Sequence, residues 1–110
     1  MTEPIDYVEL PGGDLAATKD FYAAAFGWSF QDYGPEYAAL QDAGLDGGFD
    51  ANTATGTAPL VILKAADLEG ALARVEAAGG EVVDPIFDFP GGRRFHFRDP
   101  AGNLLGVWGE

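Results

Sequence analysis

The chain carries the same helix signature twice, and this internal repeat constrains the fold more than any other feature. A shift of 53 positions places Asp14-Leu15 on Asp67-Leu68, aligns an Ala-Ala pair near the end of each copy, and places Gly27 on Gly80. Each copy of such a repeat is one supersecondary unit that buries its apolar face against its neighbour. We therefore expect two like modules, with any binding site at their concave junction.

Hydrophobic periodicity predicts the same element order in both copies: a strand, a helix and three more strands. Asp14 and Asp67 are typical N-cap residues for the two helices. The predicted strands are 5–10, 28–33, 37–41 and 45–50 in the first copy, and 60–64, 81–89, 93–98 and 104–108 in the second. The fold class is therefore α+β, with two βαβββ modules. We expect one domain over residues 1–110, divided into module one (about 4–51), a linker (about 52–58) and module two (about 59–110).

The charge balance excludes several classes of protein. With 18 acidic and 6 basic residues, the formal net charge is −12, which repels nucleic acids and anionic membranes. The chain has no cysteine, and the segment Met1–Asp6 lacks the basic and apolar regions of a signal peptide. We therefore expect a soluble, cytoplasmic protein. Three of the six bases, Arg93, Arg94 and Arg98, surround the single histidine, His96.

The chain resembles the vicinal oxygen chelate superfamily, which includes glyoxalase I, extradiol dioxygenases, and fosfomycin and bleomycin resistance proteins. The resemblance covers nearly the whole chain and is carried by Tyr7-Val8-Glu9-Leu10, Asp14-Leu15, Phe21-Tyr22, Phe26-Gly27-Trp28, Ala77-Ala78-Gly79-Gly80 and Phe97-Arg98-Asp99-Pro100-Ala101-Gly102-Asn103. It implies two βαβββ modules whose mixed sheet curves round a cavity with the helices outside. Many members of this superfamily are homodimers, and we expect one here.

Members of the superfamily usually hold a divalent metal with His, Gln or Glu side chains on the cavity-facing strands, and the metal acts as a Lewis acid. The resemblance places the ligand positions at Tyr7, at Pro59 or Leu60, at Gly106, and near Asp46. Tyrosine, proline, leucine and glycine are not the ligands that such a site uses. We therefore expect neither a metal nor another cofactor.

Strand alternation, placed in the frame of the resemblance, predicts which side chains line the cavity. Phe95 and Phe97 fall on the helix-packed face of their strand, which leaves Arg94 and His96 facing the cavity. Flat surfaces would come from aromatic side chains, an anion would be held by Arg94 and His96, and Glu9 would pair with a base or accept a proton. The full set of predicted ligand contacts is Tyr7, Glu9, Tyr37, Leu60, Ile62, Arg94, His96 and Trp108.

Structural roles compete with these functional ones. The aromatic residues also suit a core, and the bases also suit ion pairs with nearby carboxylates. Three functions stay open at this point. The first is a metal-independent protein that binds a small anionic or aromatic molecule. The second is a metal-dependent lyase, isomerase or dioxygenase with atypical ligands drawn from Glu9, His96 and Asp46. The third is a dimeric interaction module whose cavity is filled. The sequence does not name the ligand or say whether modules pair within one chain or between two.

Overall fold

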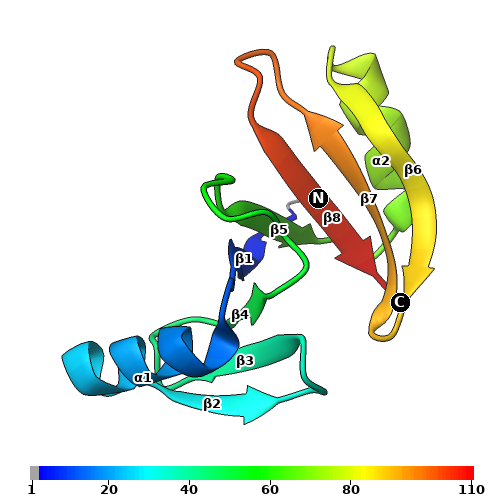
Figure 1. Ribbon diagram of the computed structural model, residues 1–110. Helices are drawn as coiled ribbons and strands as arrows, with labels where there is room; N and C mark the ends of the chain where they lie inside the picture. Colours follow the sequence, from blue (N-terminus) through cyan, green and yellow to red (C-terminus); the bar gives the residue numbers. More distant parts are fainter. Residues whose placement is uncertain (1–2) are drawn as a thin grey trace. The chain divides into compact units, whose positions relative to one another are not determined.

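A computed structural model describes residues 3–110 and shows an α+β fold (Figure 1). The described residues form two compact units. We call residues 7–59 the N-terminal unit, and residues 3–6 with 60–110 the C-terminal unit. The first two residues of the Met1–Asp6 segment, and of the predicted domain, lie outside the described part. The division into modules 4–51 and 59–110 within one domain stays a prediction.

The order of elements confirms two βαβββ modules. The first module contains β1 (Ile5–Pro11), α1 (Leu15–Phe26), β2 (Ser29–Asp32), β3 (Tyr37–Gln41) and β4 (Gly47–Asp50). The second contains β5 (Leu60–Lys64), α2 (Leu68–Ala77), β6 (Glu81–Phe89), β7 (Gly92–Arg98) and β8 (Leu104–Gly109). Strand β4 is shorter than predicted, because it begins at Gly47 rather than at Leu45. Strand β2 likewise omits the predicted end residues Trp28 and Tyr33.

The strands of each module follow the same path, so the sequence repeat is also a repeat of topology. In the first module, the strand order is β2-β3-β4-β1, with β1 parallel to β4 and the other pairs antiparallel. In the second, the order is β5-β8-β7-β6, with β5 parallel to β8 and the other pairs antiparallel. Each module is therefore a mixed four-stranded sheet with one helix.

Both helices begin at the predicted caps. The Asp14 carboxylate accepts from the Ala17 amide, and the Asp67 carboxylate accepts from the Gly70 amide. The left-handed glycine that follows each helix differs by one position between the copies. Gly27 adopts the left-handed conformation after α1 (φ 75°), whereas in the second copy Gly79 does so (φ 100°) rather than Gly80. The alignment of Gly27 with Gly80 is therefore off by one at this turn. Helix α2 is also two residues shorter than the twelve-residue α1.

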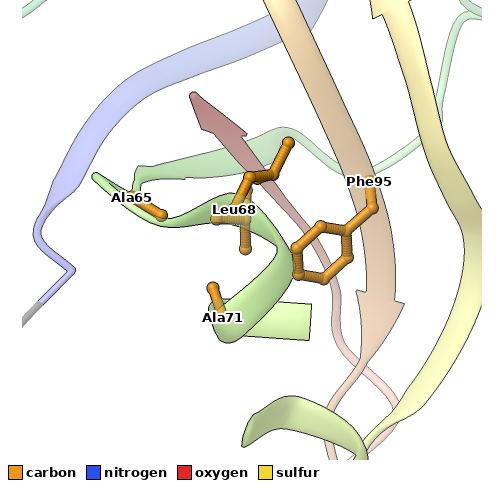
Figure 2. Packing of buried hydrophobic residues seen from close by; sticks show 5 residues of the cluster. Ala65, Leu68, Ala71 and Phe95 are labelled. Carbon is orange, nitrogen blue, oxygen red and sulfur yellow. The ribbon is translucent and has the colours of Figure 1, made fainter. Parts of the chain in front are cut away.

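The core of the C-terminal unit lies between α2 and one face of its sheet, as predicted. Phe95 of β7 is fully buried and points at the first turn of α2, where Leu68 and Ala71 are also buried (Figure 2). Val107 and Ala65 complete the cluster, and Leu72, Val75 and Phe97 pack against it. This burial of apolar side chains holds α2 on the sheet. It also fixes which face of β7 remains for Arg94 and His96.

The N-terminal unit packs through aromatic rings. Tyr22 of α1 stacks on Trp28, with ring centroids 4.8 Å apart and an interplanar angle of 11°, and it also contacts Phe49 of β4. Phe21 and Phe26 of the same helix are 57% and 64% exposed. The aromatic side chains of α1 are therefore buried only in part. Within residues 3–110, no helix is long and apolar enough to cross a membrane.

Candidate functional site

The face of the C-terminal sheet that turns away from α2 carries two rows of side chains. Strand register aligns Asp84, His96, Gly106 and Ile62 in one row. It aligns Phe87, Arg94, Trp108 and Lys64 in the other. Four of the predicted contacts, Ile62, Arg94, His96 and Trp108, therefore share one face. Leu60, also predicted, precedes Ile62 by two residues on β5 and lies on the same side of that strand.

A β-bulge brings β6 into this arrangement. Asp84 pairs with His96 and Phe87 pairs with Arg94, so three steps along β6 match two along β7. The register shifts on both sides of Asp84, around Pro85. Such a bulge changes the face of the following residues, and it places Asp84, Phe87 and Phe89 on the same side. Strand β6 is the end strand of its sheet, which is where a strand with an internal proline such as Pro85 is usually found.

Arg94 lies over two aromatic rings. Its guanidinium carbon is 5.5 Å from the ring centre of Phe87 and 5.3 Å from that of Phe89. Phe89 meets the edge of Trp108 at 6.2 Å. Stacking on rings orients a guanidinium, and the fork of an arginine matches the geometry of a planar anion. The adjacent Arg93 points to the opposite face, where it forms an ion pair with Glu69 of α2.

The imidazole of His96 is held from one side by a carboxylate. His96 Nδ1 lies 2.7 Å from Asp84 Oδ2, and Phe87 presents its ring edge-on at 5.3 Å. A Cβ added to Gly106 would lie 3.2 Å from His96 Cδ2, so the absence of a side chain at Gly106 makes room for the ring. His96 Nε2 is shielded from solvent and has no hydrogen-bond partner among residues 3–110. Because a carboxylate accepts from Nδ1–H, a neutral imidazole here presents Nε2 as an acceptor.

Trp108 is engaged on two sides. Its indole N–H donates to Asp6 Oδ2 at 2.9 Å, and the ammonium of Lys64 lies 4.8 Å from the ring centre. The row from Phe87 to Lys64 therefore alternates aromatic, cation, aromatic, cation across four strands. Such a surface suits a flat ligand with negative charge.

The predicted contacts of the N-terminal unit form a second cluster. Tyr7 and Glu9 lie two residues apart on β1, and Tyr37 lies on β3. The hydroxyl oxygens of Tyr7 and Tyr37 are 2.5 Å apart, and the Tyr37 hydroxyl donates to Glu9 Oε2 at 3.2 Å. All three predicted residues are therefore in contact within this unit.

Burial is the largest cause of the raised pKa of Tyr7. The hydrogen bond between Tyr7 and Tyr37 lowers this pKa, and the negative charges of Glu9 and Asp46 raise it further. The pKa of Tyr37 is also raised, first by burial and then by its hydrogen bond with Tyr7 and the charge of Glu9. Both phenols therefore remain protonated at neutral pH. A hollow of about 580 Å³ in the same unit lies at the β3–β4 turn, is lined by residues 40–46, and includes none of these three.

The positions that the superfamily uses for metal ligands hold unsuitable groups. Gly106 has no side chain and is covered by His96, Leu60 is aliphatic, and the Tyr7 hydroxyl is hydrogen-bonded to Tyr37. Across residues 3–110, no three His, Cys, Asp or Glu side chains are grouped as a metal ion requires. The residues present at these positions do not fit a superfamily metal site.

Sequence reasoning missed several residues that build the site: Asp6, Asp84, Phe87 and Phe89. Lys64 followed from the alternation of β5, because it shares a face with Ile62. The β6 residues did not, because the bulge at Pro85 breaks their alternation. A regular strand would have placed Asp84 and Phe87 on opposite faces.

The fold and these positions define a two-module α+β protein of the glyoxalase type. The family model of the Glyoxalase/Bleomycin resistance protein/Dioxygenase superfamily matches residues 4–107. The chain belongs to this superfamily.

Named relatives and a solved structure agree with that membership. The chain is 30% identical over 118 residues to "Putative glyoxylase CFP32" of Mycobacterium tuberculosis, covering 94% of this chain and 44% of that protein. It is 31% identical over 124 residues to "Anthracycline biosynthesis protein DnrV" of Streptomyces peucetius, covering 93% and 45%. The chain thus spans less than half the length of either relative. A superfamily member from Vibrio splendidus has the same fold, with a TM-score of 0.73, 19% identity, and 99% and 100% of the two chains covered.

Proposed function

We propose that this chain binds a small planar aromatic anion without a metal. One observation carries the proposal: Phe87, Arg94, Trp108 and Lys64 alternate aromatic and cationic groups in a single row across the C-terminal sheet. The aromatic groups offer stacking surface, and the guanidinium offers a fork for a carboxylate or similar group. Two cations in one row of a chain of net charge −12 also attract an anion locally.

The remaining predicted contacts have supporting parts in this proposal. Leu60 supplies apolar surface beside the row, whereas Ile62 is only 3% exposed and His96 Nε2 is shielded from solvent, so these two side chains support the row by packing. Tyr7, Glu9 and Tyr37 are proposed as ligand contacts of the N-terminal unit. The name of one relative, an anthracycline biosynthesis protein, supports a fused aromatic ligand for this chain as well.

A fluorescence titration with an anthraquinone carboxylate tests the proposal. The chain has two tryptophans, so a Trp28→Phe background reports on Trp108 alone. Arg94→Gln should weaken binding about tenfold or more, because charge-assisted hydrogen bonds are worth about 1.5–3 kcal/mol. Arg93→Gln is the matched control, since Arg93 faces α2 and should bind as the parent does. Equal affinity of both variants would refute the role of Arg94.

A metal-dependent enzyme is the second candidate, and the lack of a hydrogen-bond partner for the buried His96 Nε2 among residues 3–110 favours it. Elemental analysis of protein purified without chelator, followed by thermal shift with Ni, Zn, Mn, Fe and Co, separates the two candidates. A stoichiometric metal whose stabilisation disappears in His96→Ala would support the enzyme. Unchanged ligand affinity after chelator treatment supports the metal-independent protein.

We also propose a homodimer. The matched regions cover 44% and 45% of the two curated relatives, so a second copy of this chain would supply a length comparable to the rest of either relative. Sedimentation equilibrium tests this: a mass of twice the 11.6 kDa chain is expected, and a monomer over a wide concentration range would contradict it.

A further inference from the structure

We infer that the N-terminal unit contains a directional hydrogen-bond chain, from Tyr7 to Tyr37 to Glu9, whose outer oxygen on Tyr7 accepts a hydrogen bond from a ligand hydroxyl. The ligand class is a phenol or another neutral hydroxyl compound, and a carboxylate is disfavoured at this position. The inference rests on the proposed function only in taking the chain to bind a small aromatic molecule. It adds a specificity that Arg94 does not supply.

The direction of the hydrogen bonds follows from the bond between Tyr37 and Glu9. An ionised carboxylate has no hydrogen to donate, so the bond between Tyr37 and Glu9 Oε2, 3.2 Å long, is donated by Tyr37. A phenol has a single hydrogen, and Tyr37 has therefore used its own. The bond of 2.5 Å between the two phenols must then be donated by Tyr7.

The direction of these two bonds also decides what the hydroxyl group of Tyr7 can bind. Tyr7 has committed its hydrogen to Tyr37, whereas its oxygen keeps acceptor capacity. A ligand group that approaches this oxygen must therefore donate. A ligand carboxylate would place acceptor against acceptor, and it would also meet the negative charges of Glu9 and Asp46, which act on Tyr7. Both effects select a neutral donor.

A glycine in β4 makes room for the hydrogen bonds between Tyr7, Tyr37 and Glu9. Strand β4 lies between β3 and β1, so the Tyr37 side chain must cross β4 to reach Tyr7 and Glu9. It crosses at Gly48, which pairs with Glu9 on one side and with Ala39 on the other. The nearest atoms to a Cβ added at Gly48 all belong to the Tyr37 phenol. The arrangement therefore requires glycine at this position.

Carbon NMR of the full chain, labelled at tyrosine Cζ, tests the inference at neutral pH. The four tyrosines give few resonances, and Tyr→Phe variants assign them. Phenol and benzoate are titrated separately, and the shift of Tyr7 is followed. We expect phenol to bind at Tyr7 about tenfold more tightly than benzoate, the size expected when one hydrogen bond is exchanged for an unsatisfied acceptor.

Glu9→Gln should reverse this order. A glutamine amide can donate to Tyr37, whose hydrogen then turns to Tyr7, and the hydrogen of Tyr7 becomes available to the ligand. Benzoate should then bind at Tyr7 at least as tightly as phenol. If Glu9→Gln does not fold, Tyr37→Phe serves instead, because loss of the middle hydroxyl should abolish the preference. Tyr22→Phe is the control and should keep the parental order, because Tyr22 does not act on Tyr7 or Tyr37.

Three results would overturn the inference: equal binding of the two probes to the parent, an unchanged order in Glu9→Gln or Tyr37→Phe, or no response of Tyr7 to either probe. The proposed function fails separately, when anthraquinone carboxylate binding does not depend on Arg94. If anthraquinone carboxylate binding depends on Arg94 but Tyr7 does not distinguish phenol from benzoate, only the inference is refuted. If Tyr7 prefers phenol but anthraquinone carboxylate binding does not depend on Arg94, only the proposed function is refuted.

Discussion

The phenol of Tyr37 occupies the space that a side chain at Gly48 would take, although the two residues belong to different strands. The three atoms nearest to a Cβ at Gly48 are the hydroxyl oxygen, Cζ and Cε2 of Tyr37. This relationship lets a residue of β3 reach β1 across the intervening strand. The hydrogen bonds of Tyr37 with Tyr7 and Glu9 depend on it.

Gly48→Ala should therefore destabilise the protein by about 1–3 kcal/mol, the usual cost of forcing extra volume into a packed position. Urea unfolding measures the loss. In a Tyr37→Ala background the same change should cost much less, because the atoms that collide are gone. Additive costs in this double-mutant cycle would mean that the two positions do not interact.

Alkaline pH should weaken the fold through the two phenols. Tyrosine in an unfolded chain ionises near a pKa of about 10, whereas the pKa of Tyr7 and of Tyr37 is raised in the folded state. Below about pH 10 the phenols are protonated in both the folded and the unfolded chain, so they do not change the stability with pH. Above about pH 10 the unfolded chain releases its protons first, and this ionisation favours the unfolded state. Stability should therefore fall as pH rises through this range.

Tyr37→Phe should flatten that fall, and Tyr22→Phe, which removes a hydroxyl that does not act on either phenol, is the control and should leave it as in the parent. Unfolding free energies at several pH values between about 9 and 11 give the comparison, since the slope reports the difference in bound protons. Identical slopes in the parent and in Tyr37→Phe would contradict the assignment of the effect to the hydrogen-bonded pair.

The proton of neutral His96 should reside on Nδ1. Asp84 Oδ2 lies 2.7 Å from that nitrogen and accepts only. Nitrogen NMR of the imidazole distinguishes the two tautomers, and Asp84→Ala should remove the preference. The Pro85 bulge positions Asp84, so an unchanged tautomer in Asp84→Ala would mean that the bulge has no effect on His96.

The equivalent caps of the two modules should have similar effects on stability. Asp67→Ala should cost about 1 kcal/mol, the typical loss for an N-cap, and Asp14→Ala should cost a comparable amount. Asp67→Asn should retain most of the stability, because asparagine caps equally well. Thermal unfolding of the three variants is the measurement, and a costly Asn variant would point to a role of the charge itself.

The sequence by itself determined the features that depend on local periodicity and on the repeat. Asp14 and Asp67 cap helices because their neighbours in sequence supply the amide groups. Phe95 and Phe97 point to α2 because alternation along one strand is strict, which assigns Arg94 and His96 to the opposite face. The superfamily followed from the same motifs, and the match over residues 4–107 confirms it.

Only the tertiary structure decided which side chains meet. The bulge in β6 turns Asp84 toward His96 and Phe87 toward Arg94, and a count of residues along a regular strand would separate them. The hydrogen bond of Tyr37 with Glu9 joins β3 to β1, and it forms only because Gly48 of the intervening β4 has no side chain. Local sequence sets the alternation within each strand. The register between strands decides the contacts, and that register depends on packing between residues far apart in the chain.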